Sequence, residues 1–493
     1  MTALVGCSSS SADGSSAAGA AGASGSGAAS GAGAGAPTTG AGGHTGGSSS
    51  TSTGSGGLPP VDASCDLDGA AFCDAFAQAS PGGRAGALDD AHWSLSRLGY
   101  GCSPGFAFPE TALNLCGTWQ TVQPGGPDSQ FCVNEDNDPR WVEGFNDNGD
   151  FNYLSARIRR PFDFAGRTGT IQWEADARTS GSHGWWVETW ITEDPIPGPN
   201  FHAPDQLVTS RRAIGITLDL NCGVPAGGLG TAGAGKVGVS QILIADEYGV
   251  TNHYDPFGPG NDNSRCVTTE QGKLNTVQVK ISETRVEVWA TGVQGEPLER
   301  IAETDVNVGF SRGYAHISHV HYNAHKADVP SFQAYQWARV AFDGPQLPTP
   351  RAYQIADPLT PAQMGNDCAQ AYRIAYAVTD GKVYDFGDME TPITLKFTGV
   401  DPSGGTSARL NFSTSYVNAG DMLRYRLNGG SWHDYQVPAI QDSGARQGFS
   451  VPVEVSELGA GDNTVEFGTN SDAPNMVPDS MHVANIDLEI EAP

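Results

Sequence analysis

Short runs of alternating apolar and polar residues cover most of the chain beyond about residue 65. Because successive side chains of a strand point to opposite faces, this period of two predicts β-strands that bury one face. Clusters of Gly, Pro, Asn and Asp separate the runs, and none of the runs has the period of a three-turn helix. The strand-like runs are 153–162, 169–178, 184–192, 213–221, 236–245, 275–282, 285–292, 314–322 and 334–344. Their number and spacing predict an all-β fold of antiparallel sandwiches.

A second series of such runs follows after a break in the pattern. Residues 347–363 are rich in proline and lose the alternation, which is typical of a linker between domains. Beyond this segment, strand-like runs return at 393–400, 408–417, 422–438, 448–456, 463–470 and 482–491. We therefore predict two antiparallel β-sandwich (jelly-roll) domains, residues 58–346 and 364–493. In the second domain, LNGGSW at 427–432 predicts a hairpin turn that presents Trp432 near its tip.

The N-terminal part of the chain has a different composition. Residues 8–57 are almost wholly Ser, Gly, Ala and Thr, which cannot form a hydrophobic core, so we expect a disordered linker. The preceding LVGC at 4–7 resembles the lipobox of bacterial lipoproteins. That resemblance implies that residues 1–7 are the end of a truncated signal sequence and that Cys7 carries a lipid anchor.

Composition restricts the partners and the compartment. The chain has 55 Asp and Glu against 27 Lys and Arg, a formal net charge of −28, which argues against a nucleic-acid partner. It contains no run of eighteen apolar residues, so we expect contact with a membrane through the lipid anchor only. Eight cysteines besides Cys7 suit an exported protein with disulfides, whose pairing the sequence leaves open. We expect a cell-surface or outer-membrane lipoprotein, or one at the periplasmic face.

Three segments of the first domain form a recognisable pattern. They are DDAHWSLSR (89–97), the stretch from NYLSARIRRPF to GWWVETWIT (152–192) and AYQWARVAFDGP (334–345). The pattern resembles the concanavalin A-like lectin/glucanase jelly roll over about residues 66–346. In the second domain, LGAGDNTVEF before the final VANIDLEIE resembles the galactose-binding-like sandwiches that accompany glycan-active proteins. These resemblances imply a polysaccharide or oligosaccharide as the partner.

The catalytic motif of the best-known glucanases of this fold does not occur in the sequence. Family 16 glycoside hydrolases carry Glu-x-Asp-x-x-Glu on a central strand, which supplies the nucleophile and the acid/base. The strand that we align with it, RAIGITLDLN, offers only Asp219. If the protein is a glycoside hydrolase or a polysaccharide lyase, its paired carboxylates are to be sought among Glu188, Glu174, Asp176 and Asp219.

The densest group of candidate site residues is GWWVETW at 184–190. On a strand, Trp186, Glu188 and Trp190 share one face, and two indoles beside a carboxylate suit the recognition of a sugar. In the alternative interpretation both tryptophans belong to the core and Glu188 pairs with Arg157 or Arg159. We name Trp186, Trp190, Arg157 and Trp432 as candidate ligand-binding residues.

Histidines are concentrated in YAHISHVHYNAHK at 314–326. On a strand, His319 and His321 share one face about 6–7 Å apart, near enough to bind one ligand or one metal ion, whereas His316 lies on the other. A metal would need further ligands from other strands, and ordinary structural roles remain open for all three. In an enzyme, His319 and His321 would join Glu188 as catalytic candidates.

Loops rich in Asp and Asn raise the question of calcium. NEDNDPR (134–140) and FNDNGDFN (145–152) offer the oxygen ligands that calcium prefers, although Asp, Asn and Gly are also ordinary turn residues. Structural calcium is therefore the candidate cofactor. The candidate ligands are Asp136, Asp138, Asp147 and Asp150.

These features predict a surface-tethered protein that recognises an extracellular polysaccharide without cleaving it. The first alternative is a glycan-active enzyme with a non-standard active site. The second is a structural surface protein whose sandwiches bind other proteins.

Overall fold

The computed structural model confirms the expected all-β class. The residues that it describes are 65–77, 88–100, 128–133, 139–146, 151–179, 185–197, 212–219, 222, 236–246, 249–254, 265–270, 272–322, 332–355, 378–379, 382–383, 393–415, 422–436, 447–469 and 482–492. They form strands, turns and short 3-10 segments such as Val455–Glu457, and belong to one compact unit, Leu58–Pro493. Within these residues, no helix has the length and apolar character needed to cross a membrane.

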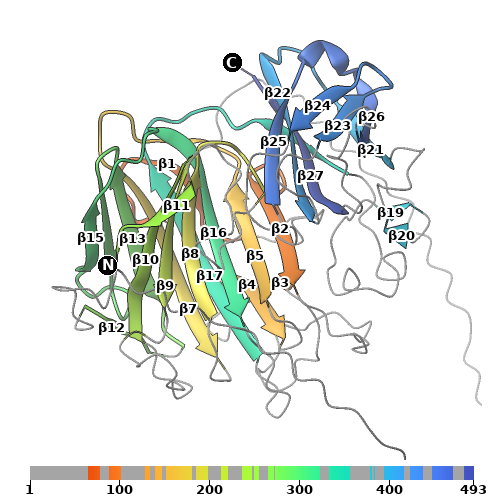
Figure 1. The fold of residues 1–493 in the computed structure, drawn as a ribbon. Coiled ribbons are helices and arrows are strands. Elements are labelled where there is room, and N and C mark those ends of the chain that lie inside the picture. Colours follow the sequence, from red (N-terminus) through yellow and green to blue (C-terminus); the bar gives the residue numbers. More distant parts are fainter. Residues whose placement is uncertain are drawn as a thin grey trace, which may run out of the picture. The chain divides into compact units, whose positions relative to one another are not determined.

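The first sandwich consists of two antiparallel sheets, which we name after their central strands. The spatial order of the β17 sheet is β15 (Glu299–Asp305), β14 (Arg285–Ala290), β13 (Asn275–Ser282), β7 (Gly169–Thr179), β17 (Phe332–Asp343), β4 (Pro139–Asn146) and β3 (Asp128–Val133). A further strand, β1 (Ala70–Asp74), pairs with β17. Figure 1 shows β7 and β17 behind the strands of the second sheet.

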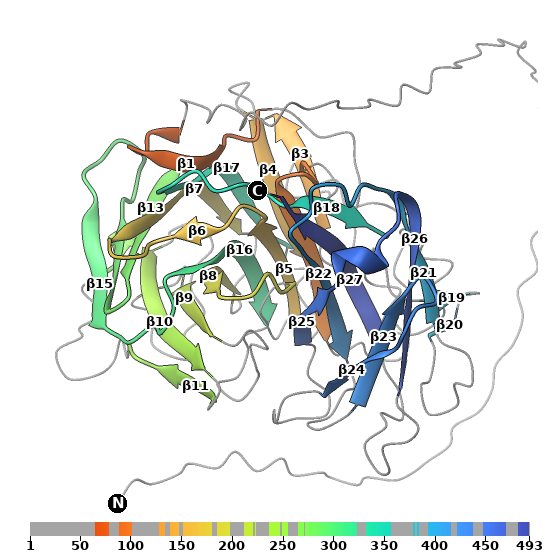
Figure 2. The same ribbon diagram turned by 90° about the horizontal axis from the view of Figure 1, so that it is seen from above.

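The second sheet, the β16 sheet, carries most of the residues that the sequence singled out. Its spatial order is β11 (Gly249–Asn252), β10 (Lys236–Asp246), β9 (Ala213–Asp219), β8 (Trp185–Thr192), β16 (Arg312–Tyr322), β5 (Phe151–Ile158) and β2 (Trp93–Tyr100). The short strands β12 (Val267–Thr268) and β6 (Phe162–Asp163) pair with β10 and β16. Figure 2 shows the two sheets as separate layers.

The core between these sheets follows from the alternation in the sequence. Val187 and Ile191 of β8 pack into one apolar cluster with Trp173 of β7 and Trp337 of β17. The Trp173 indole Nε1 donates a hydrogen bond of 3.1 Å to the Thr189 hydroxyl, which joins the two sheets through the core. Even-numbered residues of β8, which include Glu188 and Trp190, therefore lie on the outer face of the β16 sheet.

The second sandwich has its own core and two further sheets. The β22 sheet is ordered β18 (Arg351–Gln354), β27 (His482–Glu491), β22 (Ser407–Ser415) and β25 (Gln447–Val453). The β26 sheet is ordered β21 (Ile393–Val400), β26 (Gly461–Thr469), β23 (Met422–Leu427) and β24 (His433–Gln436). A two-stranded pair, β19 (Val378–Thr379) and β20 (Lys382–Val383), stands apart from both sheets. Strand β18 lies inside the segment expected to be a linker, because Arg351–Gln354 pairs in register with β27.

A buried charge cluster joins the two sandwiches. Its members are Arg157 and Arg159 of β5 and its C-terminal end, and Asp487 and Glu489 of β27, each at most 3% exposed. Arg157 Nη2 donates to Glu489 Oε1 at 2.6 Å, and Arg159 Nη1 donates to both Asp487 and Glu489. The Ser94 hydroxyl of β2 also donates to Asp487. The outer face of the β22 sheet is therefore buried against the outer face of the β16 sheet around β2 and β5.

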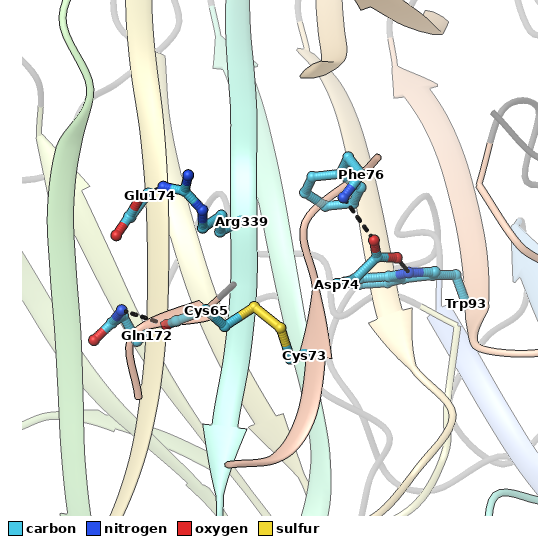
Figure 3. Close-up of a disulfide and its surroundings, with 8 residues drawn as sticks. All are labelled: Cys65, Cys73, Asp74, Phe76, Trp93, Gln172, Glu174 and Arg339. Carbon is cyan, nitrogen blue, oxygen red and sulfur yellow. Dashed lines mark hydrogen bonds and ion pairs between the residues drawn. A yellow bond between two sulfur atoms is a disulfide. The ribbon is translucent and has the colours of Figure 1, made fainter. Parts of the chain in front are cut away.

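A disulfide holds the segment that leads into β1 against the outer face of the β17 sheet. Figure 3 shows Cys65 bonded to Cys73, with Gln172 Nε2 donating to the Cys65 carbonyl at 3.2 Å. A second disulfide joins Cys222 to Cys266. Both pairs suit the expectation of an exported protein, since disulfides persist in oxidising compartments.

Candidate functional site

A row of buried polar side chains crosses the outer face of the β16 sheet. In register from β9 to β2, the row consists of Thr217, Glu188, Ser318, Ser155 and Ser96. All five are at most 4% exposed, and the Ser318 hydroxyl donates to the Ser155 hydroxyl at 2.7 Å. Sequence alternation predicted the face of Glu188 but not its burial.

Glu188 is the carboxyl group of this row and is 1% exposed. The Trp190 indole Nε1 donates to its Oε2 at 2.8 Å. Burial raises the pKa of Glu188 to about 8, although the hydrogen bond from Trp190 and the neighbouring Thr217 hydroxyl act in the opposite direction. Glu188 is therefore mostly protonated at neutral pH, because desolvation disfavours the carboxylate.

This pKa predicts a pH dependence of stability that Glu188→Gln removes. The unfolded carboxyl ionises above its ordinary pKa of 4.5, whereas the folded one stays protonated until about pH 8. Over that window each pH unit lowers the contribution of Glu188 to folding stability by about 1.4 kcal/mol. From pH 5 to pH 7 we expect the free energy of unfolding of the wild type, measured in urea, to fall by about 2–3 kcal/mol relative to that of Glu188→Gln. Parallel stability curves for the two proteins would show that Glu188 ionises normally in the fold.

Trp190 belongs to a small apolar cluster on the same outer face. It is fully buried and packs with Ile196, Ala213, Leu243 and Ala245. Its ring lies directly over Gly215 of the neighbouring strand, where a Cβ atom would overlap the indole. Trp190 is therefore a buried packing residue, as in the alternative interpretation of the sequence.

The histidine strand is arranged differently from the expected catalytic set. Register places His316 opposite Trp190, in the row next to Glu188, whereas His319 is opposite Val187 and His321 opposite Trp185. His319 is thus paired with the core residue Val187, whereas the residue paired with Glu188 is Ser318. The side chains of His319 and His321 lie outside the described residues, as do those of Trp186 and Asp219.

His316 is the histidine that reaches the outer face. It is fully buried, and its Nε2 lies 2.9 Å from the Thr192 hydroxyl, which itself donates to the Asp194 carbonyl. Thr192 therefore accepts from His316, which assigns the proton to Nε2. Burial, with a contribution from the nearby Arg157 charge, holds the pKa of His316 well below its ordinary value of 6.5. His316 is therefore neutral at physiological pH.

Arg157 and the two candidate acids of the β17 sheet interact with residues other than Glu188. Arg157 is 1% exposed and its guanidinium belongs to the charge cluster. Glu174 lies on the outer face of the β17 sheet, where it pairs with Arg339 (Figure 3) and where burial raises its pKa. Asp176 lies on the same face and accepts from the Gly272 amide at 3.1 Å. The core of the first sandwich separates Glu174 and Asp176 from Glu188, so these acids do not form a pair.

The second sandwich presents a different kind of site around Trp432. The sequence LNGGSW forms the expected hairpin, in which Asn428 and Gly429 have φ of 51° and 68° and β23 pairs with β24. Positive φ at both central positions is the conformation that favours Asn-Gly. The Asn428 side chain donates to Asn463 at 2.7 Å and accepts from the Thr464 amide at 2.9 Å. These bonds hold the turn that precedes Trp432 in one position.

Charged side chains surround the Trp432 ring on the outer face of the β26 sheet. The Arg424 and Arg426 guanidinium carbons lie 5.3 and 4.5 Å from the ring centroid. Arg424 Nη2 donates to Asp434 at 2.9 Å, and Arg426 Nη2 donates to Glu466 at 2.7 Å. We call these five residues the Trp432 surface. Trp432 is half-buried and Asp434 is exposed, whereas Glu466 is buried beside Arg426. The surface therefore offers an indole, two guanidinium groups and the Asp434 carboxylate to solvent.

Other expected sites lie outside the described residues. These are Cys7 and the candidate calcium ligands Asp136, Asp138, Asp147 and Asp150. In the described part of the chain, no group of three or more His, Cys, Asp or Glu side chains is arranged to hold a metal ion. Calcium at the Asp-rich loops stays a prediction.

Comparison with known proteins found similarity only among solved structures. No family model matches the chain, and no curated protein matches it. The exoplasmic/lumenal domain of VIP36 in its Ca2+/Man-bound form is 12% identical, with a TM-score of 0.27, over 48% of this chain and 90% of that chain. The lectin from Bauhinia forficata in complex with GalNAc is 11% identical, with a TM-score of 0.25, over 45% and 92%. LamAcat from Zobellia galactanivorans is 10% identical, with a TM-score of 0.30, over 56% and 98%.

Proposed function

We propose that the protein recognises an extracellular polysaccharide without cleaving it, and that the Trp432 surface contacts the sugar. The observation that supports this most is the half-buried indole of Trp432, whose ring centroid lies 5.3 Å from the Arg424 and 4.5 Å from the Arg426 guanidinium carbon. Pyranose rings stack their C–H faces on aromatic rings, and their hydroxyl groups bind carboxylates and guanidinium groups at the edge.

The rigidity of the Trp432 surface favours binding. Both arginines are held by carboxylates, and the hairpin turn before Trp432 is fixed by Asn428. A sugar would therefore bind without ordering long side chains, which lowers the entropic cost of association. The β26 sheet also lies on the side of the second sandwich away from the charge cluster, since that cluster occupies the outer face of the β22 sheet.

The proposal includes export and attachment to the cell surface. The disulfides Cys65–Cys73 and Cys222–Cys266 support an oxidising compartment. Lipidation of Cys7 and the spacer 8–57 would hold the sandwiches away from the membrane, within reach of polysaccharide.

Replacing Trp432 tests the proposal directly. In affinity electrophoresis of the full chain through gels containing laminarin, mannan, xylan, galactan or alginate, we expect retardation by at least one of them. Trp432→Ala should weaken that binding by about tenfold or more, equivalent to about 1.4 kcal/mol. Lys396→Ala is the matched control, because Lys396 is an exposed residue of the same sheet that pairs with Asp462. Equal retardation of Trp432→Ala and wild type would contradict a role for this surface.

A glycan-cleaving enzyme is the second candidate, and the protonated Glu188 favours it. A carboxyl group with a pKa of about 8 has the protonation state that a general acid needs at neutral pH. Asp219, His319 and His321 remain proposals as its partners in that case. An enzyme would lose product formation but keep polysaccharide retardation in Glu188→Gln, whereas a binding protein has no product formation to lose.

A further inference from the structure

The first sandwich also carries a partly exposed tryptophan, Trp289 of β14. Strand β14 alternates between the core residues Val286 and Val288 and the outward residues Glu287 and Trp289. Trp289 therefore lies on the outer face of the β17 sheet, one strand from its β15 edge.

Two cationic side chains flank the Trp289 ring. Lys280 Nζ of β13 lies 4.8 Å from the ring centroid, and the Arg300 guanidinium carbon of β15 lies 5.7 Å from it. The indole Nε1 donates to Glu287 Oε2 at 3.1 Å, which fixes the ring. Gln278 of β13 is directly opposite Trp289 and is partly exposed. We call these five residues the Trp289 surface.

The Trp289 surface and the Trp432 surface contain the same kinds of side chain in similar contacts. In both, a partly exposed indole contacts two cationic side chains. In both, carboxylates hold a flanking guanidinium, since Arg300 pairs with Glu287 and with Glu303 at 2.8 Å. Such a ring is fixed before any ligand arrives, and the charged groups at its edge are placed to bind hydroxyls.

We propose that the Trp289 surface is a second sugar-contacting surface, so that one chain binds polysaccharide at two places. This inference rests on the proposed function. With Lys280, the ion-pair network that runs through this surface has three cations and three carboxylates: Lys280, Arg285 and Arg300 against Glu287, Glu303 and Asp305. A balanced surface suits uncharged pyranose residues better than a polyanion, which a protein of net charge −28 would repel.

The order of the sheets sets the distance between the two surfaces. The charge cluster joins the outer faces of the β16 and β22 sheets. The Trp289 surface lies on the outer face of the β17 sheet and the Trp432 surface on that of the β26 sheet. Packed sheets are about 10 Å apart, so three spacings place the surfaces at least about 30 Å apart, and the offset of β14 from the contact at β2 and β5 adds to this. A short oligosaccharide cannot reach both, but a long polymer or two separate polymers can.

The test combines a short and a long form of one glycan on the full chain. The probes are the polysaccharide of the panel (laminarin, mannan, xylan, galactan or alginate) that retards the wild type most, and its hexasaccharide. We expect calorimetry to give about two hexasaccharides per wild-type chain and about one for Trp289→Ala or Trp432→Ala. Retardation by the polymer should fall by about tenfold or more in either variant, because avidity is lost.

Two further variants separate binding from folding. Trp289→Tyr keeps an aromatic ring and should keep about two sites with weaker affinity. Glu283→Ala, at the exposed turn before β14, should behave as the wild type. If Trp289→Ala keeps wild-type stoichiometry and retardation while Trp432→Ala loses them, the inference is wrong and the proposed function stands. If no polysaccharide of the panel retards the wild type, both are overturned.

Discussion

Arg159→Met is expected to lower the free energy of unfolding by about 3–5 kcal/mol, because it leaves buried carboxylates without their cation. Arg159 is fully buried and pairs with Asp487 and Glu489. Its Nε also donates to the carbonyls of Asp90 at 2.7 Å and Trp93 at 2.9 Å. The substitution therefore removes the partner of several buried oxygen atoms at once.

Arg285→Met provides the matched control for this prediction. Arg285 also contacts three carboxylates, those of Glu287, Glu303 and Asp305, but its side chain is 43% exposed. Water replaces those contacts when the arginine is removed, so we expect little change in stability. Guanidinium chloride unfolding of both variants at pH 7 measures the difference. A loss for Arg159→Met no greater than that for Arg285→Met would show that the charge cluster does not hold the sandwiches together.

Trp190→Ala is expected to cost about 3–5 kcal/mol of stability, since it empties the apolar cluster on the outer face of the β16 sheet. The ring fills the space above Gly215 and is fully buried. Its loss also removes the hydrogen bond from Nε1 to Glu188. Urea unfolding measures the cost, and the polysaccharide that retards the wild type measures binding by the same protein.

Trp432→Ala is the matched control for the loss of an indole. Trp432 is only half-buried, so its removal should cost clearly less stability while it weakens sugar binding. The opposite pattern, in which Trp190→Ala folds normally and loses binding, would return Trp190 to the sugar-binding role that its sequence context first suggested.

The fold class was accessible from sequence because alternation is a local signal. In β14 the order Arg285, Val286, Glu287, Val288 shows both faces of the strand at once. The hairpin before Trp432 was predictable for the same reason, since Asn428 and Gly429 alone determine the turn. Strand β18 was missed, because proline on both sides hides the four residues Arg351–Gln354 and only pairing with β27 makes them a strand.

The candidate site was less accessible, because its properties depend on contacts between distant segments. Alternation placed Glu188 and Trp190 on one face, but it could not show that other residues bury this face. The sequence does contain a trace of the charge cluster, because Arg157 and Arg159 are two residues apart, as are Asp487 and Glu489. Their separation of about 330 residues left no local pattern that joined them. The register between β8 and β16 places His316 in the row next to Glu188, and this pairing cannot be read from the local pattern of either strand.

Burial and exposure now divide the candidate residues by role. Glu188, Trp190, His316 and Arg157 are buried inside the first sandwich or at its contact with the second. Trp432 and Trp289 are partly exposed, and each is held by neighbouring charges in a fixed orientation. This division favours recognition of a glycan at the outer faces of the two sandwiches.

The most direct measurement of the central claim is a polysaccharide pull-down with the full chain, followed by a reducing-end assay and a 235 nm assay for unsaturated product on every polysaccharide that binds. We predict retention without new reducing ends or unsaturated product, and clearly weaker retention of Trp432→Ala than of the wild type. Product formation by the wild type, abolished in Glu188→Gln, would contradict a non-catalytic function and identify the protein as a glycan-cleaving enzyme.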